Sequence, residues 1–293
     1  MEAHDKSQTL QQLSRMIQSL EDPCTSASRA VATGWDAVDR ALCDFQTSHS
    51  NSQSASACHG PVQLEIGNGQ LEMGRGGLKV GAIHEFLGPL PADALQDAGS
   101  PPVAPSGKQS SLSPACLLAW LARQAAAAME GEVVWVGRRC WPNPQFLARA
   151  GLLERSLVVE APDAKDRLWA IELALRSPAV AAVVGDAENF KLPATRRLEL
   201  AARDSQSLVL LSRPARELSV SSAATTRWAV YRQVSDSVRP AWMLELLRCK
   251  GRQVSQGGRW PMEWDCAKGA VIIPPAMVDR LSSTPQAALR AIG

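Results

Sequence analysis

The sequence predicts an α/β protein with a mostly parallel central sheet, helices on both faces of that sheet, and an antiparallel β hairpin near the C-terminus. Three observations support this fold class. Short apolar runs alternate with amphipathic stretches between residues 82 and 204, as expected for parallel strands joined by helices. Helical patterns stop after residue 227, and two apolar runs, 241–250 and 258–265, then follow one another closely. The chain is 45% apolar and 20% charged, which suits a folded domain.

The first helix is expected over residues 7–21. Leu10, Leu13, Ile17 and Leu20 recur there at helical spacing, so they would form one apolar stripe. This pattern predicts a short amphipathic helix at the N-terminus.

A second helix is expected after Thr33, whose hydroxyl is predicted to cap it. The helix would carry Trp35, Val38 and Leu42 toward the core. The Ser-rich stretch 46–60 then predicts a disordered surface insertion.

Gly-rich turns separate short alternating runs in residues 61–81, which predicts small strands. Strand–helix alternation follows. The predicted pairs are 82–86 with 115–129, 132–137 with 143–150, 156–161 with 163–176, and 180–186 with 193–204, followed by strands 207–212 and 227–233.

The chain therefore divides into three predicted parts. Residues 1–30 are predicted to form an N-terminal helix and a linker. Residues 31–233 form the α/β core, with insertions at 46–60 and 89–113. Residues 234–293 form the hairpin and a tail.

Composition restricts the class of protein. The net charge is +2, which is too balanced to predict nucleic-acid or membrane binding. The sequence contains no apolar run long enough to span a bilayer, and its start is polar. Seven scattered cysteines without a C-x-x-C pair predict free thiols, no zinc site and a cytoplasmic location.

Several strings in this order resemble the RecA family: "TGWDAVDRAL", "GGLKVGAIHEFLGP", "VVWVGRRCWPNPQFLARAGL", "VAAVVGD" and "LVLLS". The resemblance covers about residue 30 to 265 and implies a RecA-like core. Within that group the chain resembles the ImuA family, the RecA-like accessory proteins of the bacterial translesion mutasome. The strings "GGLKVGAIHEFLG", "SSAATTRW" and "LELLRCKG" carry this narrower resemblance. ImuA proteins are related to SulA-like proteins, so a cell-division inhibitor is a competing expectation.

The resemblance implies a nucleotide site, but the residues depart from it. Gly107 and Lys108 match the end of the phosphate-loop pattern G-x-x-x-x-G-K-[ST], whereas Pro102 replaces its first glycine and Gln109 its hydroxyl residue. A proline has no N–H to offer a phosphate. Arg139 stands where RecA proteins carry the catalytic glutamate, and an arginine cannot accept a proton.

Asp186 matches the carboxylate that helps RecA proteins hold Mg²⁺, although a cap or salt-bridge role explains an acid at a strand end as well. Ser212 and Arg213 replace the pair that senses the γ-phosphate. We therefore expect no ATP hydrolysis, no catalytic residue and no bound cofactor, with weak binding of ATP and Mg²⁺ as the alternative.

The regions that correspond to the RecA DNA-binding loops are short. Arg196, Arg197 and Arg213 are the candidate nucleic-acid contacts, with Lys191 and Arg216 nearby. A solvated charged face is the competing interpretation, because the overall charge is nearly neutral. The expectation is weak or no direct DNA binding.

Assembly surfaces remain as candidates. The resemblance implies that the N-terminal helix, with Leu13 and Ile17, packs on a neighbouring subunit. It also implies that Arg248 and Lys250 reach toward that neighbour, with a basic strand edge as the alternative. The hairpin also carries Trp242, Trp260 and Trp264, as interface anchors or as core residues.

Two further residues could suggest chemistry. His84 has no nucleophile beside it and is expected to be a hydrogen-bonded structural residue. Cys140 follows Arg138 and Arg139, but with no visible partner it is expected to be an inert thiol.

Taken together, the resemblance implies a non-catalytic accessory protein of SOS-induced, error-prone translesion synthesis. It would scaffold an ImuB-like, inactive Y-family polymerase homologue, reach a DnaE-type polymerase indirectly, and modulate RecA; a homo-oligomer is compatible with this role. The alternatives are a SulA-like division inhibitor and an ATP-binding switch of the RecA type.

Overall fold

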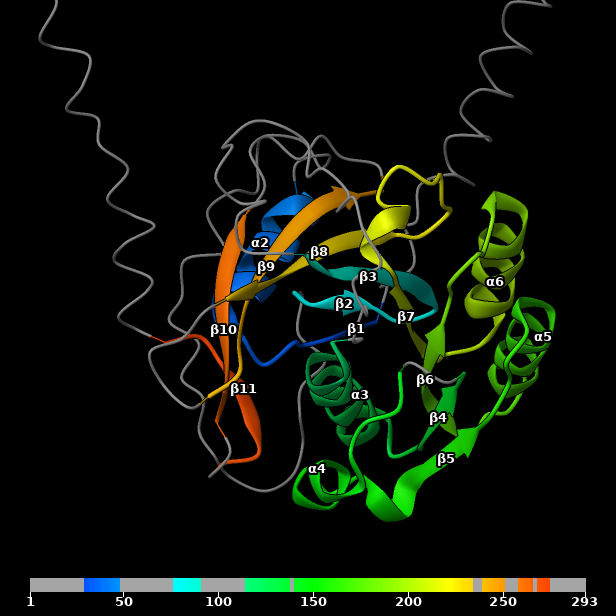
Figure 1. Ribbon diagram of the computed structural model, residues 1–293, viewed down its shortest axis with the longest axis horizontal. Coiled ribbons are helices and arrows are strands. Elements are labelled where there is room, and N and C mark those ends of the chain that lie inside the picture. Colours follow the sequence, from blue (N-terminus) through cyan, green and yellow to red (C-terminus); the bar gives the residue numbers. More distant parts are fainter. Residues whose placement is uncertain are drawn as a thin grey trace, which may run out of the picture.

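The protein is built on a nine-stranded mixed sheet with the strand order β11-β10-β9-β8-β3-β7-β6-β4-β5 (Figure 1). The computed structural model describes residues 29–47, 76–90, 114–137, 140–233, 239–250, 258–265 and 268–274. The predicted helix 7–21, most of both predicted insertions, Gly107, Lys108, Arg139 and the C-terminal tail lie outside these residues.

The strands of the large sheet are β3 (Ala82–Leu90), β4 (Glu132–Val136), β5 (Ser156–Val159), β6 (Val180–Asp186), β7 (Leu208–Arg213), β8 (Thr226–Gln233), β9 (Ala241–Cys249), β10 (Arg259–Asp265) and β11 (Ala270–Ile272). The helices are α2 (Asp36–Thr47), α3 (Ala115–Met129), α4 (Pro144–Arg149), α5 (Ala164–Leu175) and α6 (Leu192–Asp204), with the 3-10 turns η2 (Leu153–Arg155) and η3 (Ala215–Glu217). The short strands β1 (Ala30–Val31) and β2 (Leu78–Lys79) pair separately.

Parallel pairing runs from β5 to β8, as the alternating pattern predicts. The strands β3 and β7 lie in the middle and are buried on both faces, which explains their continuous apolar runs. The strands and helices predicted between residues 82 and 233 are confirmed with small shifts. Two insertion boundaries were wrong, because α2 continues through Thr47 and β3 continues through Leu90.

The strand β8 joins the two halves of the sheet. It pairs parallel with β3 on one side and antiparallel with β9 on the other. The predicted β9–β10 hairpin is confirmed, and β11, which sequence analysis missed, extends it. Leu244, Leu246, Met262 and Trp264 belong to the main hydrophobic core. The antiparallel strands therefore share one core with the parallel strands, as well as one hydrogen-bonded sheet.

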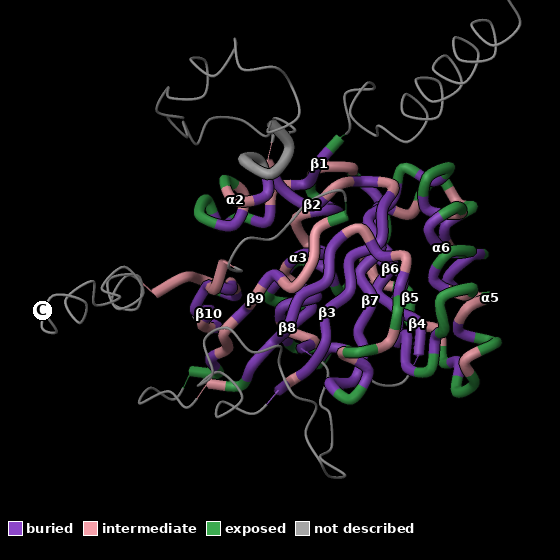
Figure 2. The backbone as a smooth tube through the Cα atoms, turned by 90° about the horizontal axis from the view of Figure 1, so that it is seen from above, coloured by how far each residue is buried: buried purple, intermediate pink, exposed green. Residues whose placement is uncertain are grey.

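Helices cover both faces of the sheet. Side chains of α2, α3 and α4 pack on one face, and side chains of α5 and α6 pack on the other (Figures 1 and 2). Alanines on α3, including Ala122 and Ala126, are fully buried, and their small side chains permit close approach to the strands. Among the described residues, we find no helix both long and apolar enough to span a bilayer.

Tryptophan indoles tie distant segments to the α3 face, which accounts for part of the unusual count of nine. The Nε1–H of Trp35 donates to the Val271 carbonyl at 2.8 Å, and that of Trp120 donates to the Thr33 carbonyl at 2.8 Å. These bonds join the N-terminal strand–helix segment to α3 and β11. An indole buried in this way satisfies its polar group while filling the core.

The predicted cap at Thr33 was wrong in detail. The helix α2 begins at Asp36, three residues later, so the Thr33 hydroxyl does not lie at its N-cap. Instead, this hydroxyl accepts a bond from Trp35 N at 3.2 Å and donates to Asp39 at 2.9 Å. The Asp39 carboxylate also accepts the Thr33 N–H at 2.9 Å. These bonds hold the loop at Thr33 against helix α2.

His84 is a hydrogen-bonded core residue, as predicted. It is fully buried in β3; its Nδ1 lies 2.7 Å from Thr226 Oγ1 and its Nε2 lies 2.9 Å from the Lys79 carbonyl. Burial lowers the pKa of His84 to about 4, because the charged ring would lose its hydration.

Acid should therefore destabilise the protein through His84. The native ring stays neutral while the unfolded ring takes up a proton below its ordinary pKa of 6.5. The stabilisation is present above that pH and is lost as pH falls toward 4, by roughly 3 kcal/mol in all. Urea unfolding between pH 7 and pH 4 should show a steeper loss for the wild type than for His84→Leu. Parallel curves for the two proteins would contradict this assignment.

Candidate functional site

The candidate site lies where the carboxyl ends of β3, β7, β6 and β4 meet. The register places Asp186 beside Ser212 and Val136 beside Gly185. In open α/β sheets this edge is where ligands bind. Asp186 follows Val184 by two residues and Ser212 follows Leu210 by two residues. Val184 and Leu210 pack on the α3 face, so the side chains of Asp186 and Ser212 also belong to the side of the sheet that α3 covers.

Asp186 is buried, with 4% of its surface exposed, and acts as a turn cap. Its Oδ1 accepts the Glu188 N–H at 3.1 Å. Gly137, at the end of β4, lies against it so closely that an added Cβ would stand 2.6 Å from the Asp186 Cβ. The hydrogen bond to the Glu188 N–H therefore explains why an acid stands at position 186. Gly137 leaves little room beside the Asp186 side chain.

The described residues do not supply a metal centre around Asp186. A Mg²⁺ ion that binds with a triphosphate takes one or two protein oxygens and completes its shell with phosphate oxygens and water. Here the Asp186 carboxylate and the Ser212 hydroxyl lie on neighbouring strands. The described part of the chain has no group of three or more His, Cys, Asp or Glu side chains arranged to hold a metal without such a ligand.

The end of β3 also differs from a strand that opens directly into a phosphate loop. The strand continues past Gly88 and pairs with β8 as far as Leu90 and Tyr231. Gly88 has a φ of +150°, and an added Cβ would stand 2.4 Å from the Val230 carbonyl oxygen. This close approach requires glycine there and extends the ladder where a phosphate loop would begin.

Arg167 is a site residue that sequence analysis missed. Its buried guanidinium reaches from α5 to the carbonyl oxygens of Asp186 and Glu188, both at 2.8 Å, and to that of Pro162. These bonds fix the chain where β5 and β6 end. One sequence feature could have revealed that Arg167 is buried. It lies on the apolar side of the helix, four residues before the buried Ile171.

Cys140 is inert by geometry, as predicted. Its thiol is fully buried and donates to the Val136 carbonyl at 3.2 Å. Burial, with the nearby negative charge of Asp186, raises the pKa of Cys140 to about 12.

The folded protein should therefore resist alkylation at Cys140. At pH 8 the thiolate is almost absent, so iodoacetamide should leave Cys140 unmodified until denaturant is added, as peptide mass spectrometry would show. Modification of Cys140 in the native protein at a rate typical of an exposed thiol would refute the buried, protonated state.

A buried ionic network lies on the opposite face of the same edge. Glu85 in β3 is fully buried and accepts from Arg213 Nη1 at 2.9 Å, from Arg227 Nε at 2.9 Å and from the Ser222 hydroxyl at 2.5 Å. Arg213 also donates to Glu217 Oε2 at 2.7 and 2.9 Å. Two arginines thus face two glutamates, so the network is balanced in charge.

This network holds the segment between β7 and β8 against the sheet. Arg227 donates to the Leu218 carbonyl at 3.2 Å, and burial lowers its pKa below the usual arginine value, although Glu85 opposes that shift. Arg248 of β9 donates to the carbonyls of Ser222 and Ala224 at 2.9 and 2.7 Å. Residues 214–225 are therefore fastened at several points along their length.

The nucleic-acid prediction for Arg213 was wrong. The side chain is 1% exposed and fully engaged with Glu85, Glu217 and the Phe190 carbonyl. Sequence pattern placed it after a strand, where an exposed arginine is common, and gave no sign of a partner 128 residues away.

Other basic residues of this region face glutamates. Arg197 pairs with Glu172, and Arg216 with Glu188. Glu199 accepts from both Arg203 and Lys250. Arg196 is exposed on the outer side of α6. Because the cations are largely matched by carboxylates, this surface offers little net charge to a phosphate backbone.

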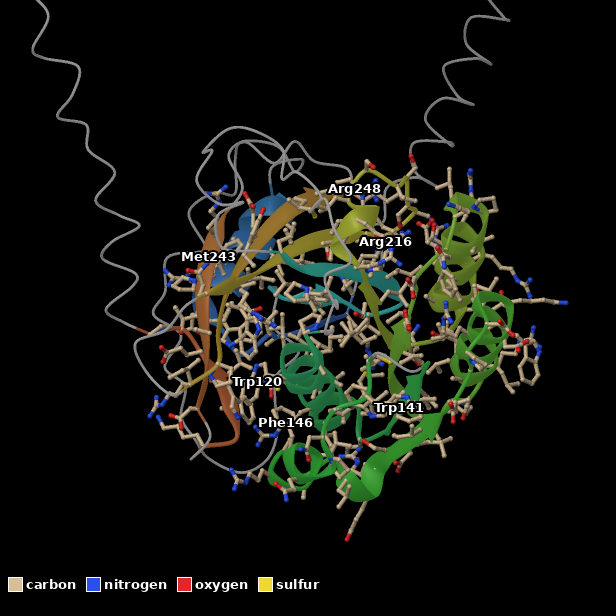
Figure 3. The ribbon with its side chains drawn as sticks, viewed as in Figure 1. Trp120, Trp141, Phe146, Arg216, Met243 and Arg248 are labelled. Carbon is tan, nitrogen blue, oxygen red and sulfur yellow. The ribbon has the colours of Figure 1, made fainter. Side chains whose placement is uncertain are left out.

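The candidate interface residues differ in placement. Trp260 is 9% exposed and packs against Trp228, with ring centroids 6.0 Å apart, so it is a core residue and the anchor prediction for it was wrong. Trp242 is partly buried against the same core. Lys250 lies in the turn after β9, and the Arg248 side chain contacts the 222–224 loop (Figure 3). Leu13 and Ile17 lie outside the described residues.

The fold and the site thus define an α/β protein with a mixed sheet, whose strand-end edge is fastened by buried ionic and carbonyl contacts. No protein-family model matches the chain. It is 32% identical over 172 residues to the protein named Protein ImuA of Caulobacter vibrioides, in strains NA1000 / CB15N and ATCC 19089 / CIP 103742 / CB 15. The match covers 53% of this chain and 69% of that relative, and the chain belongs to the ImuA family.

The network can be tested by removing the charge of Glu85. In Glu85→Gln two buried arginines would face a single carboxylate, which should lower the free energy of unfolding by about 3 to 5 kcal/mol. Urea denaturation measures this loss.

The matched control is Glu188→Gln. Its partner Arg216 has a side chain 52% exposed, so water screens the pair and the loss should be about 1 kcal/mol or less. Equal, small losses in both variants would show that the Glu85 network does not hold the strands together.

Proposed function

We propose that this chain is a non-catalytic accessory protein of damage-induced, error-prone translesion DNA synthesis. Membership of the ImuA family is the observation that carries this proposal. Pro102 and Gln109, which depart from the phosphate-loop pattern, and Arg139, at the position of the RecA catalytic glutamate, support the absence of turnover.

A RecA-like core is part of the same proposal. The strand order sets β7, β6 and β4 in succession beside β3. This brings the end of the strand that precedes Gly107 and Lys108 next to Ser212 and Asp186, the positions that the RecA resemblance makes equivalent to nucleotide-site residues. The order differs from the Rossmann order 3-2-1-4-5-6 and the flavodoxin order 2-1-3-4-5, which supports a distinct α/β class.

In the proposed role the chain acts by docking. Its partner is an ImuB-like, inactive Y-family polymerase homologue, through which it reaches a DnaE-type polymerase, and RecA is a further candidate. Residues 214–225 stand where RecA proteins carry a DNA-binding loop, and here the buried Arg227 and the partly buried Arg248 hold that segment down. This supports weak or no direct contact with DNA.

Genetic complementation tests the proposal. Deletion of the gene should lower damage-induced mutation frequency, and the wild-type gene should restore it. Asp186→Asn keeps an acceptor for the Glu188 N–H but removes the metal-binding charge, and Lys108→Ala removes the phosphate-loop cation. Both variants should restore mutagenesis fully.

Failure of both variants, at normal protein levels, would contradict a non-catalytic role. Unchanged mutagenesis in the deletion strain, together with filamentous cells on overproduction, would instead favour the SulA-like division inhibitor.

A weak nucleotide switch is a second candidate, favoured by the neighbouring Asp186 and Ser212. It requires that ATP with Mg²⁺ raise the melting temperature of the wild type, because a ligand that binds only the native state stabilises it. The same shift should vanish in Lys108→Ala.

A further inference from the structure

The outer surface of α5 and α6 exposes large apolar side chains. Trp169 is 62% exposed, Leu173 49% and Leu200 57%. Other tryptophans of the chain, such as Trp135 and Trp228, are almost fully buried. A group of exposed apolar residues on one surface commonly marks a contact with another segment or molecule.

These three residues share one surface. Ile171 of α5 and Leu198 of α6 point toward the sheet, so Trp169, Leu173 and Leu200 lie on the sides of the helices that face away from it. An ion pair between Glu172 and Arg197 links the two helices, which lie beside each other in Figure 1. We call Trp169, Leu173 and Leu200 the α5–α6 outer patch.

The described part of the chain begins close to the C-terminal end of α6. The Arg29 carbonyl accepts the Val80 N–H at 2.9 Å, which fixes the chain beside Gly81. A Cβ added at Gly81 would stand 3.2 Å from the Ala202 carbonyl oxygen, near the C-terminal end of α6. Arg29, the first described residue, therefore lies close to the helix that carries Leu200.

The sequence of the N-terminal arm, residues 1–28, suits the patch. Leu10, Leu13, Ile17 and Leu20 would form an apolar stripe on a helix over residues 7–21. Such a helix is about 22 Å long. The linker 22–28 can span about 23 Å when extended, which is enough to lay the helix across α6 and α5.

Charge also favours this occupant. Glu21 and Asp22 follow the apolar stripe, at the end of the segment nearest to Arg29. Arg196 lies on the exposed side of α6, whereas Arg203 of the same helix pairs with Glu199. The acidic end of the arm thus carries a charge opposite to that of Arg196.

We propose that residues 7–21 of the chain dock as an amphipathic helix on the α5–α6 outer patch of the same molecule. The docked arm covers Trp169. This inference does not depend on the proposed function, and it assigns the arm a site within its own chain.

Hydroxyl-radical footprinting of the full chain, read by mass spectrometry, tests the docking. The double variant Leu13→Asp with Ile17→Asp should raise the oxidation rate of Trp169 and Leu173 several-fold over the wild type. Trp141, which is 39% exposed and lies just before α4 on the other face, serves as the internal reference and should not change.

The matched control places the same two charges on the polar side of the predicted helix, as Gln11→Asp with Gln18→Asp. It should leave Trp169 as protected as in the wild type. Equal oxidation of Trp169 in all three proteins would overturn the docking. Protection that disappears on dilution, as a dimer dissociates, would place the arm on a second copy and overturn docking within one chain.

Discussion

The contact between Glu85 and its two arginines is the interaction on which the rest of the structure depends. Both the Glu85 and the Arg213 side chains are fully buried, so each charge has lost its hydration and must be matched by the other. The three partners come from β3, β7 and β8, the strands at the centre of the sheet. The network therefore fixes the point where its parallel half meets its antiparallel half.

The strand β8 links the parallel part of the sheet to the antiparallel part. Because it accepts a parallel neighbour on one edge and an antiparallel neighbour on the other, the last three strands become part of one sheet with one core. The side chains that they contribute, Trp260 among them, pack on the α3 face. A surface for partners must therefore be sought on the outer sides of the helices and loops, not in the buried tryptophans of the hairpin.

Much of the fold could be predicted from local pattern. The alternation of strands and helices, the hairpin, the buried His84 and the inert Cys140 follow from apolar periodicity and from the lack of reactive neighbours. The failures have a common cause in long-range contacts. Arg213 resembled an exposed loop residue because Glu85 is distant in sequence. Arg167 resembled an ordinary helix residue because its carbonyl partners lie at the end of β6 and in loops. The Thr33 cap failed because its hydroxyl bonds Asp39 within the helix, not the helix N-terminus.

Side-chain bonds from Arg227 and Arg248 fasten residues 214–225 to the scaffold. Hydrogen exchange of the amides in this segment, with and without single-stranded DNA and Mg-ATP, shows whether the segment is ordered before any ligand binds. We expect slow exchange in the free protein that these ligands leave unchanged, because Glu85, Arg227 and Arg248 already hold the segment. Fast exchange in the free protein that slows on adding DNA would contradict this expectation.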